Sequence, residues 1–172
     1  MTFSTDSIQN RFSNFNYDTQ LVDAVNSTVG VFKSLSVDDQ LGVLWFVYTE
    51  MGRSITPAAT GAARLQLAFG LLSQIKQMSA EEQLQVMRDL AGKNNTQVSR
   101  AYSILSANTK LAFWYELSEL MVKGFVVLMP SNYQLSRDGS QVLESIKGLD
   151  FGQQITVLRK VVTDMGVDPL AD

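Results

Sequence analysis

Two stretches of the sequence bring a leucine, a tryptophan and a tyrosine onto one face of an expected helix, where they could hold a flat ligand. In LAFWYELSELM, the positions i, i+3, i+4, i+7 and i+10 are Leu111, Trp114, Tyr115, Ser118 and Met121, which is helical spacing. Aromatic rings bind conjugated molecules by dispersion and offset stacking. The face is therefore a candidate wall of a ligand slot, and ordinary core packing is the alternative.

The second stretch, LGVLWFVYTEM, repeats this arrangement with Leu41, Leu44, Trp45 and Tyr48 at i, i+3, i+4 and i+7. The two stretches together use both tryptophans of the chain. Two such walls facing each other would form a groove for a long conjugated molecule. Methionine side chains are flexible and polarizable, so they suit the filling of such a groove. The candidates for this filling are Met87, Met121 and Met129.

The chain lacks two residue types that enzymes often use for acid–base or nucleophilic chemistry. It contains no cysteine and no histidine, which excludes a thiol nucleophile, a disulfide, a zinc–thiolate site and an imidazole base. The motifs GxSxG and GxGxxG and a phosphate-binding loop are absent. The acidic pairs 38–39 and 81–82 fall in the first turns of expected helices, where they complement the helix dipole. We expect neither an enzyme nor a metal site.

Length and charge indicate one domain without a nucleic-acid partner. A chain of 172 residues fits a single domain. The net charge is −3 and the basic residues are scattered singly, which does not favour nucleic-acid binding. The start, MTFSTDSIQNRFSNF, lacks the pattern of a secretory signal, and apolar runs such as VLWFVY are too short for a transmembrane segment. We expect a cytoplasmic protein, and a monomer.

Apolar residues recur at helical spacing through most of the chain, which predicts an all-α fold. The sequences SVDD at 36–39, SAEE at 79–82 and, more loosely, DFGQ at 150–153 are typical of capping boxes at helix starts. A glycine in the left-handed conformation can close a helix, and we expect such ends at Gly52, Gly92, Gly124, Gly148 and Gly166. The expected helices cover residues 19–35, 37–51, 58–78, 80–91, 95–105, 107–123, 138–147 and 151–165.

Three of these helices begin with a related pattern, which fits helices packed into bundles. SVDDQLGVL resembles SAEEQLQVM, and QQITVL repeats part of it. The next position is occupied by Trp45, Arg88 and Arg159 in turn. The three helices therefore diverge at the position where a specialised residue would lie.

Four separated segments resemble the N-terminal domain of the cyanobacterial orange carotenoid protein. They are DDQLGVLWFVYTEMG, KLAFWYELSELMVKGFV, PSNYQLS and GQQITVLRKVVTDMG, at matching spacing over nearly the whole chain. The chain ends near the point where the interdomain linker of that family would begin. It is therefore most similar to the helical carotenoid proteins, free-standing relatives of the domain, and we expect residues 1–172 to form a single carotenoid-binding domain without a C-terminal regulatory domain.

This resemblance implies two interleaved four-helix bundles with a ketocarotenoid between them, which would be canthaxanthin, echinenone or 3′-hydroxyechinenone. Trp114 and Tyr115 would pack against one terminal ring, and the small Ser118 would leave space for it. Ser118 stands where the full-length family typically has glycine and Met129 where it has isoleucine, so ring tilt and channel width can differ here. The implied channel residues are Leu41, Leu44, Trp45, Tyr48, Leu84, Met87, Leu111, Trp114, Tyr115, Ser118, Met121, Met129, Pro130, Tyr133, Ile155, Thr156, Arg159 and Val162.

The resemblance further implies a photoprotective protein that quenches singlet oxygen constitutively, since the domain that closes over the carotenoid in the full-length family would be absent. One alternative is docking on the phycobilisome antenna and quenching of its excitation, for which Arg159 is the candidate contact. Another is a carotenoid carrier that exchanges pigment with a partner resembling the C-terminal domain. A helical adaptor without a ligand remains the last alternative.

Overall fold

The computed structural model describes residues 5–52 and 65–170, and the side chains of the first helix from Tyr17 onward. Every regular element in these residues is a helix, which confirms the all-α prediction. The helices are α1 (Thr5–Ser34), α2 (Val37–Met51), α3 (Leu65–Lys76), α4 (Ala80–Ala91), α5 (Gln97–Ser103), α6 (Ala107–Val122), α7 (Arg137–Gly148) and α8 (Phe151–Thr163).

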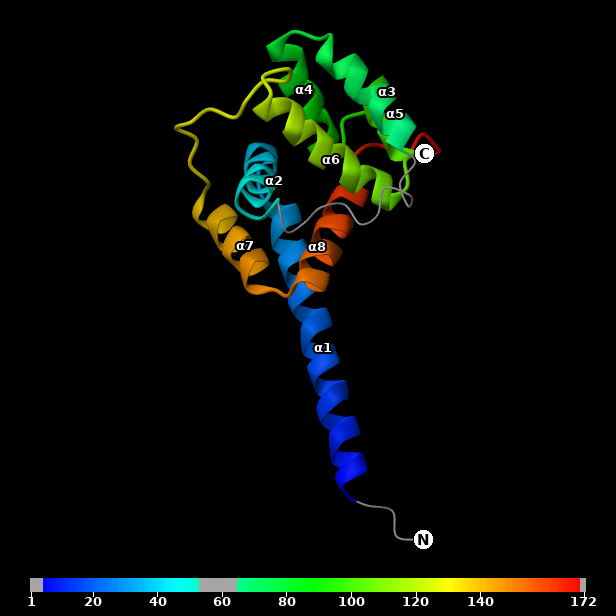
Figure 1. Ribbon diagram of the computed structural model, residues 1–172, viewed down its shortest axis with the longest axis vertical. Helices are drawn as coiled ribbons and strands as arrows, with labels where there is room; N and C mark the ends of the chain where they lie inside the picture. The colour runs from blue at the N-terminus through cyan, green and yellow to red at the C-terminus, as the bar shows by residue number, and fades with distance from the viewer. Residues whose placement is uncertain (1–4, 53–64, 171–172) are drawn as a thin grey trace.

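The helices form two groups that interleave along the chain (Figure 1). One group contains α3, α4, α5 and α6, and the other contains α2, α7, α8 and the C-terminal part of α1. The two groups meet where α6 packs on α8 and where α2 packs on α4. The N-terminal part of α1 extends away from both groups. The arrangement of two interleaved four-helix bundles is therefore the observed one.

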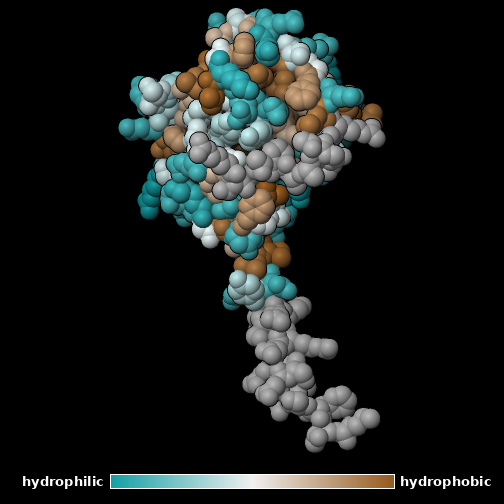
Figure 2. Space-filling model, viewed as in Figure 1, coloured by the Kyte–Doolittle hydropathy of each residue, from teal (hydrophilic) through white to brown (hydrophobic). Residues whose placement is uncertain are grey.

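The core follows from the amphipathic helices and fills the space between them. Val43, Phe113 and Val157 come from α2, α6 and α8, and none of them has exposed surface. Complete burial of an aliphatic or aromatic side chain of this size contributes about 1.5–3 kcal/mol. Some apolar side chains are exposed, such as Leu67 and Phe69 of α3. The face shown in Figure 2 combines hydrophilic surface with apolar patches.

Two of the three expected capping boxes are confirmed. The side chain of Ser79 accepts a hydrogen bond from the backbone of Glu82, whose carboxylate accepts from the backbone of Ser79. Asp150 and Gln153 form the same reciprocal pair at the start of α8. At the start of α2 the prediction is wrong in its second half: Ser36 accepts from the backbone of Asp39, but the carboxylate of Asp39 binds residues of another segment.

Only two of the five expected glycine helix ends adopt the left-handed conformation. Gly124 and Gly166 have φ angles of 78° and 81°. Gly52 and Gly92 keep right-handed helical angles, and Gly148 is the last residue of α7. After α4 the positive φ belongs to a non-glycine residue, 56° at Lys93, so the chain turns one residue later than expected.

The boundaries of most helices lie within three residues of the expected ones, and α1 is the exception. It begins at Thr5 rather than at residue 19, because the polar stretch before residue 19 contains no proline or glycine to stop a helix. The expected helix 58–78 is α3 from Leu65 onward, and its first part lies outside the described residues. Within the described residues, no helix is long and apolar enough to cross a membrane.

Candidate functional site

An apolar groove between the two helix groups consists of two adjoining pockets. The helix-walled pocket is lined by α2, α6 and α8 and has a cavity volume of about 60 Å³. The strap-covered pocket is lined by α2, α4, α6 and the irregular segment after α6, with a cavity volume of about 190 Å³. Leu44, Trp114 and Ser118 line both pockets. The two aromatic faces found in the sequence therefore meet across one groove.

Trp114 lies at the junction of the pockets and is held by a chain of hydrogen bonds. Its indole Nε1 donates to the hydroxyl of Tyr102 at 2.9 Å, and this hydroxyl donates to the carbonyl of Val162 at 2.6 Å. The ring of Phe113 packs edge-on against Trp114, with ring centroids 5.7 Å apart. Because the polar atom of the indole is bonded away from the groove, Trp114 presents ring carbons to it.

Ser118 is the small residue that interrupts the aromatic face of α6. Its hydroxyl donates to the carbonyl of Trp114 one turn earlier, at 2.9 Å. This back-bond within the helix satisfies the hydroxyl. The side chain therefore adds little bulk and no unpaired polar atom to either pocket.

Tyr48 and Tyr115 lie against each other at the edge of the helix-walled pocket. Their rings meet edge to face with centroids 5.7 Å apart, and the ring centroid of Trp45 lies 5.8 Å from that of Tyr48. The hydroxyl of Tyr48 donates to the carboxylate of Glu119. Burial and this hydrogen bond raise the pKa of Tyr48 well above its usual value, so its ring remains neutral.

The strap, defined as residues 125–136, connects α6 to α7 without a helix and covers the larger pocket. Its first end is held by Gln83, whose side-chain amide donates to the carbonyl of Phe125 at 3.1 Å. The side-chain oxygen of Gln83 accepts from the backbone of Val127 at 2.8 Å. Between the two ends of the strap, Leu128, Met129 and Pro130 line the pocket.

The second end of the strap is held by Asp39 of α2. Its carboxylate accepts from the hydroxyl of Tyr133 at 2.7 Å and from the backbone of Ser136 at 3.2 Å. Burial alone would raise the pKa of Asp39, but these hydrogen bonds outweigh it and lower the pKa. Burial and the bond to Asp39 raise the pKa of Tyr133 to about 12. The strap is therefore tied to α2 by an ionised carboxylate.

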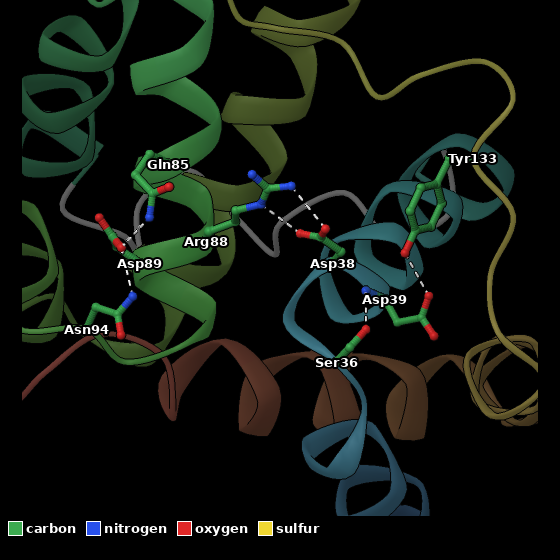
Figure 3. A network of polar contacts seen from close by, with 8 residues as sticks. All are labelled: Ser36, Asp38, Asp39, Gln85, Arg88, Asp89, Asn94 and Tyr133. Carbon is green, nitrogen blue, oxygen red and sulfur yellow. Dashed lines mark hydrogen bonds and ion pairs between the residues drawn. The ribbon is translucent and has the colours of Figure 1, made fainter.

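Asp38 and Arg88 form a polar rim on the larger pocket (Figure 3). Arg88 Nε donates to one carboxylate oxygen of Asp38 at 2.8 Å and Nη2 to the other at 3.0 Å. This bidentate pair joins α4 to α2. From the sequence, Asp38 was predicted only to complement the helix dipole, and Arg88 was not predicted to belong to a site. The repeated helix-start pattern nevertheless singled out the position of Arg88.

All residues expected in the channel from α2, α4, α6 and the strap line the two pockets. From α8, only Val162 does so, joined by Leu158, which the sequence did not indicate. Other lining residues that were not expected are Val47, Gly52, Gly42, Val127 and Leu128. The expected channel residues that line the pockets are Leu41, Leu44, Trp45 and Tyr48 of α2, Leu84 and Met87 of α4, Leu111, Trp114, Tyr115, Ser118 and Met121 of α6, and Met129, Pro130 and Tyr133 of the strap.

The expected channel residues Ile155, Thr156 and Arg159 of α8 do not line either pocket, so their contact with a ligand stays a prediction. The physical reason is that the groove meets α8 only at its C-terminal part, at Leu158 and Val162. Ile155 packs on the core, and the hydroxyl of Thr156 donates to the carbonyl of Gly152. The Nε of Arg159 is buried and has no hydrogen-bond partner.

The structure offers no acidic cluster for a metal ion: within the described residues no group of three or more potential ligands comes together. The chemistry of the groove is instead that of apolar contact. Three of its hydroxyl groups are bonded within the protein, those of Ser118, Tyr48 and Tyr133. A lining of this kind accepts a large apolar ligand without leaving buried polar groups unpaired.

Comparison with known proteins identifies a family over most of the chain. The family model described as "Orange carotenoid protein, N-terminal" matches residues 18–168. An orange carotenoid-binding domain-containing protein of Nostoc sp. is 77% identical over 172 residues, which is 100% of both chains. The orange carotenoid-binding protein of Synechocystis sp. is 47% identical over 96% of this chain and 51% of its own length. The chain thus spans about half of that longer relative.

Two solved structures have the same fold. The red carotenoid protein of Anabaena (Nostoc) sp. binding canthaxanthin is 42% identical, with a TM-score of 0.73 over 84% of this chain and 99% of that one. The orange carotenoid protein of the same organism, also binding canthaxanthin, is 52% identical, with a TM-score of 0.79 over 86% of this chain and 48% of that one. The chain described here belongs to the family of orange carotenoid protein N-terminal domains.

Proposed function

We propose that this protein binds a ketocarotenoid along the groove and acts as a constitutive quencher of singlet oxygen. The observation that carries the proposal is the continuous aromatic and aliphatic lining that joins the two pockets through Leu44, Trp114 and Ser118. The solved relatives that bind canthaxanthin support this choice of ligand class. Echinenone and 3′-hydroxyechinenone belong to the same class and remain candidates.

A bound carotenoid would supply the photochemistry, since its low-lying triplet state accepts energy from singlet oxygen and releases it as heat. The task of this chain is to hold the pigment in a fixed, water-excluding setting. Trp114 serves this task because the bond to Tyr102 fixes its ring. Tyr48 serves it through the bond to Glu119, which keeps its ring beside Tyr115.

The two ends of the groove would receive the terminal rings. At the helix-walled end, Trp114 and Tyr115 offer ring faces and edges for one terminal ring. At the other end, Met129 and Pro130 of the strap close over the pocket beside Trp45. Dispersion contacts with these side chains grow with the area that they share with the pigment.

The experiment is an absorption spectrum of the protein purified from a canthaxanthin-producing host. A broad, red-shifted visible band that co-elutes with the protein is expected. The holoprotein should then shorten the lifetime of singlet oxygen from a photosensitiser more than the apoprotein does, before as well as after illumination. A folded, helical but colourless protein would contradict the proposal, and quenching that appears only after illumination would contradict its constitutive character.

Docking on the phycobilisome is a second candidate function, and Arg159 is the residue that favours it. Its Nε is buried without a hydrogen-bond partner, and no ion pair of Arg159 is present among residues 5–52 and 65–170. The cation therefore remains available to an acidic partner in the cytoplasm. Quenching of phycobilisome fluorescence by the holoprotein at low salt, lost in Arg159→Leu and retained in the exposed Arg100→Leu, is the expected result. Undiminished antenna fluorescence with the wild-type holoprotein would exclude docking.

A further inference from the structure

The strap-covered pocket has one charged edge in an otherwise apolar lining. On α4, Leu84, Met87 and Arg88 all line this pocket, because residues three and four apart share a helix face. On α2, Asp38 precedes the lining residue Leu41 by one turn. The ion pair between Arg88 and Asp38 therefore joins α4 to α2 within the lining of this pocket, and Figure 3 shows the pair.

Asp38 fixes the guanidinium of Arg88 but does not use all of its donors. A guanidinium has five N–H groups in a planar fork. Nε and Nη2 donate to the two oxygens of Asp38, whereas Nη1 takes part in none of the hydrogen bonds found among the described residues. The hydroxyls in this pocket are already committed, that of Tyr133 to Asp39 and that of Ser118 to its own helix.

A neutral oxygen is the chemical partner that suits this edge. The carboxylate of Asp38 compensates the charge of Arg88, so the pair does not require a second anion. Its remaining N–H groups can donate to a carbonyl or hydroxyl oxygen, and hydrogen bonds from a charged donor are stronger than neutral ones. A ligand that is apolar along its length and carries an oxygen on its end ring matches both parts of the pocket.

We propose that Arg88, held in place by Asp38, donates a hydrogen bond to an oxygen on the terminal ring at the strap-covered end and thereby selects carotenoids that are oxygenated on that ring. This inference rests on the proposed carotenoid binding and adds a residue that distinguishes ligands by the oxygen on their terminal ring. The alternative is that the ion pair only links α2 to α4 and stabilises the fold. That role would be weak, since both side chains are more than 40% exposed and exposed ion pairs contribute little to stability.

The first test is the infrared carbonyl region of the protein loaded with canthaxanthin, with the keto bands identified by isotope labelling of the pigment oxygens. Canthaxanthin has one keto group on each ring. In the wild type, one keto band should lie at lower frequency than the other because its oxygen accepts the hydrogen bond. In Arg88→Met this band should return to the frequency of an unbonded keto group. Arg100→Met, at an exposed position outside both pockets, should leave it unchanged.

The second test offers equal amounts of canthaxanthin and β-carotene, which has the same polyene and rings but no oxygen. The ratio of bound canthaxanthin to bound β-carotene should fall by about tenfold in Arg88→Met, the effect of one hydrogen bond to a charged group. Arg100→Met should keep the wild-type ratio. The ratio reports selection by the oxygen and not total binding, so a general loss of stability would not change it.

The outcomes separate this inference from the proposed function. A wild type that takes up no pigment would contradict carotenoid binding itself. Pigment bound with the same keto bands and the same ratio in the wild type and Arg88→Met would overturn the role of Arg88 while binding stands. If Arg88→Met does not fold, the wild type decides alone: two keto bands that both lie at the frequency of an unbonded keto group would overturn the proposal.

Discussion

The two pockets of the groove are built by different means. The helix-walled pocket is enclosed by α2, α6 and α8, and a hydrogen-bonded chain through Tyr102 fixes its central tryptophan. The strap-covered pocket, with a cavity about three times as large, is closed on one side by an irregular segment that Gln83 and Asp39 hold at its ends. Packing therefore determines the shape of the first, and a few polar bonds determine the shape of the second.

Replacement of Trp114 should have the largest effect, because this residue belongs to both pockets. Trp114→Ala removes a buried indole and leaves the hydroxyl of Tyr102 without its donor. We expect a loss of about 3–5 kcal/mol in the free energy of unfolding and an altered carotenoid spectrum. Urea unfolding and the absorption spectrum of the loaded protein measure the two effects.

Trp114→Phe is the matched control, because it keeps an aromatic ring but removes the N–H donor. It should cost about 1 kcal/mol through the lost hydrogen bond to Tyr102. A carotenoid spectrum that is identical in the wild type, Trp114→Phe and Trp114→Ala would mean that this ring does not contact the pigment, and the junction of the pockets would not be the binding site.

Asp39→Asn should loosen the strap-covered pocket while leaving the other pocket intact. The neutral amide loses the charge-assisted bonds from Tyr133 and Ser136, so we expect a loss of about 2 kcal/mol. Hydrogen exchange should accelerate at the amide of Ser136. The neighbouring Asp38→Asn is the control, because its half-exposed ion pair is worth under about 1 kcal/mol. Equal losses from both variants would refute the special role of Asp39.

The stability that the hydrogen bonds between Asp39 and the strap contribute should also depend on pH. Its folded-state pKa lies below the ordinary value of 3.8, so the ionised form stabilises the fold above that pH. This contribution is lost as the pH falls below 3.8 through the folded-state pKa. The difference in unfolding free energy between wild type and Asp39→Asn should narrow from about pH 6 to about pH 3. Asp164, whose pKa is also lowered although burial alone would raise it, titrates in both proteins and cancels. A difference in unfolding free energy that stays constant between these pH values would contradict the lowered pKa of Asp39.

The contrast between the helix-walled pocket and the strap-covered pocket also explains which site residues the sequence could predict. Helical periodicity found the faces of α2 and α6 because side chains three and four apart necessarily share a face. It could not find the strap, which has no period. Pro130 and Tyr133 came from the family resemblance alone, and Met129 was first indicated only by its flexible, polarizable side chain. The bonds that hold the strap join residues far apart in the chain, 94 positions between Asp39 and Tyr133 and 44 between Gln83 and Val127. For the same reason Asp39 was predicted to bond within its own helix start.

On α8, periodicity and resemblance could not show how far the groove extends. Ile155 and Val162 are seven residues apart and share a face, yet only Val162 lines a pocket. The groove crosses the C-terminal part of this helix, and the position of that crossing depends on how α6 packs on α8. Such packing is a property of the assembled helices. Arg88 was missed for a related reason, since its partner Asp38 lies 50 positions away.

The smallest effect should come from Gly42 of α2, on which the strap rests. A Cβ at this position would lie 2.8 Å from a side-chain carbon of Leu135 and 2.9 Å from one of Tyr133. Gly42→Ala must therefore shift the side chains of Leu135 and Tyr133, at a cost of about 1–3 kcal/mol that the better helix propensity of alanine offsets by about 1 kcal/mol. Gly30→Ala in α1 has the propensity gain without the clash, since nothing lies within 4 Å of its Cβ. It should stabilise the protein, whereas Gly42→Ala should destabilise it and change the pigment spectrum. If both variants were stabilised alike, the strap would adjust to the added methyl group without a cost in free energy. The ligand, and not the contacts between the strap and α2, would then determine the shape of the larger pocket.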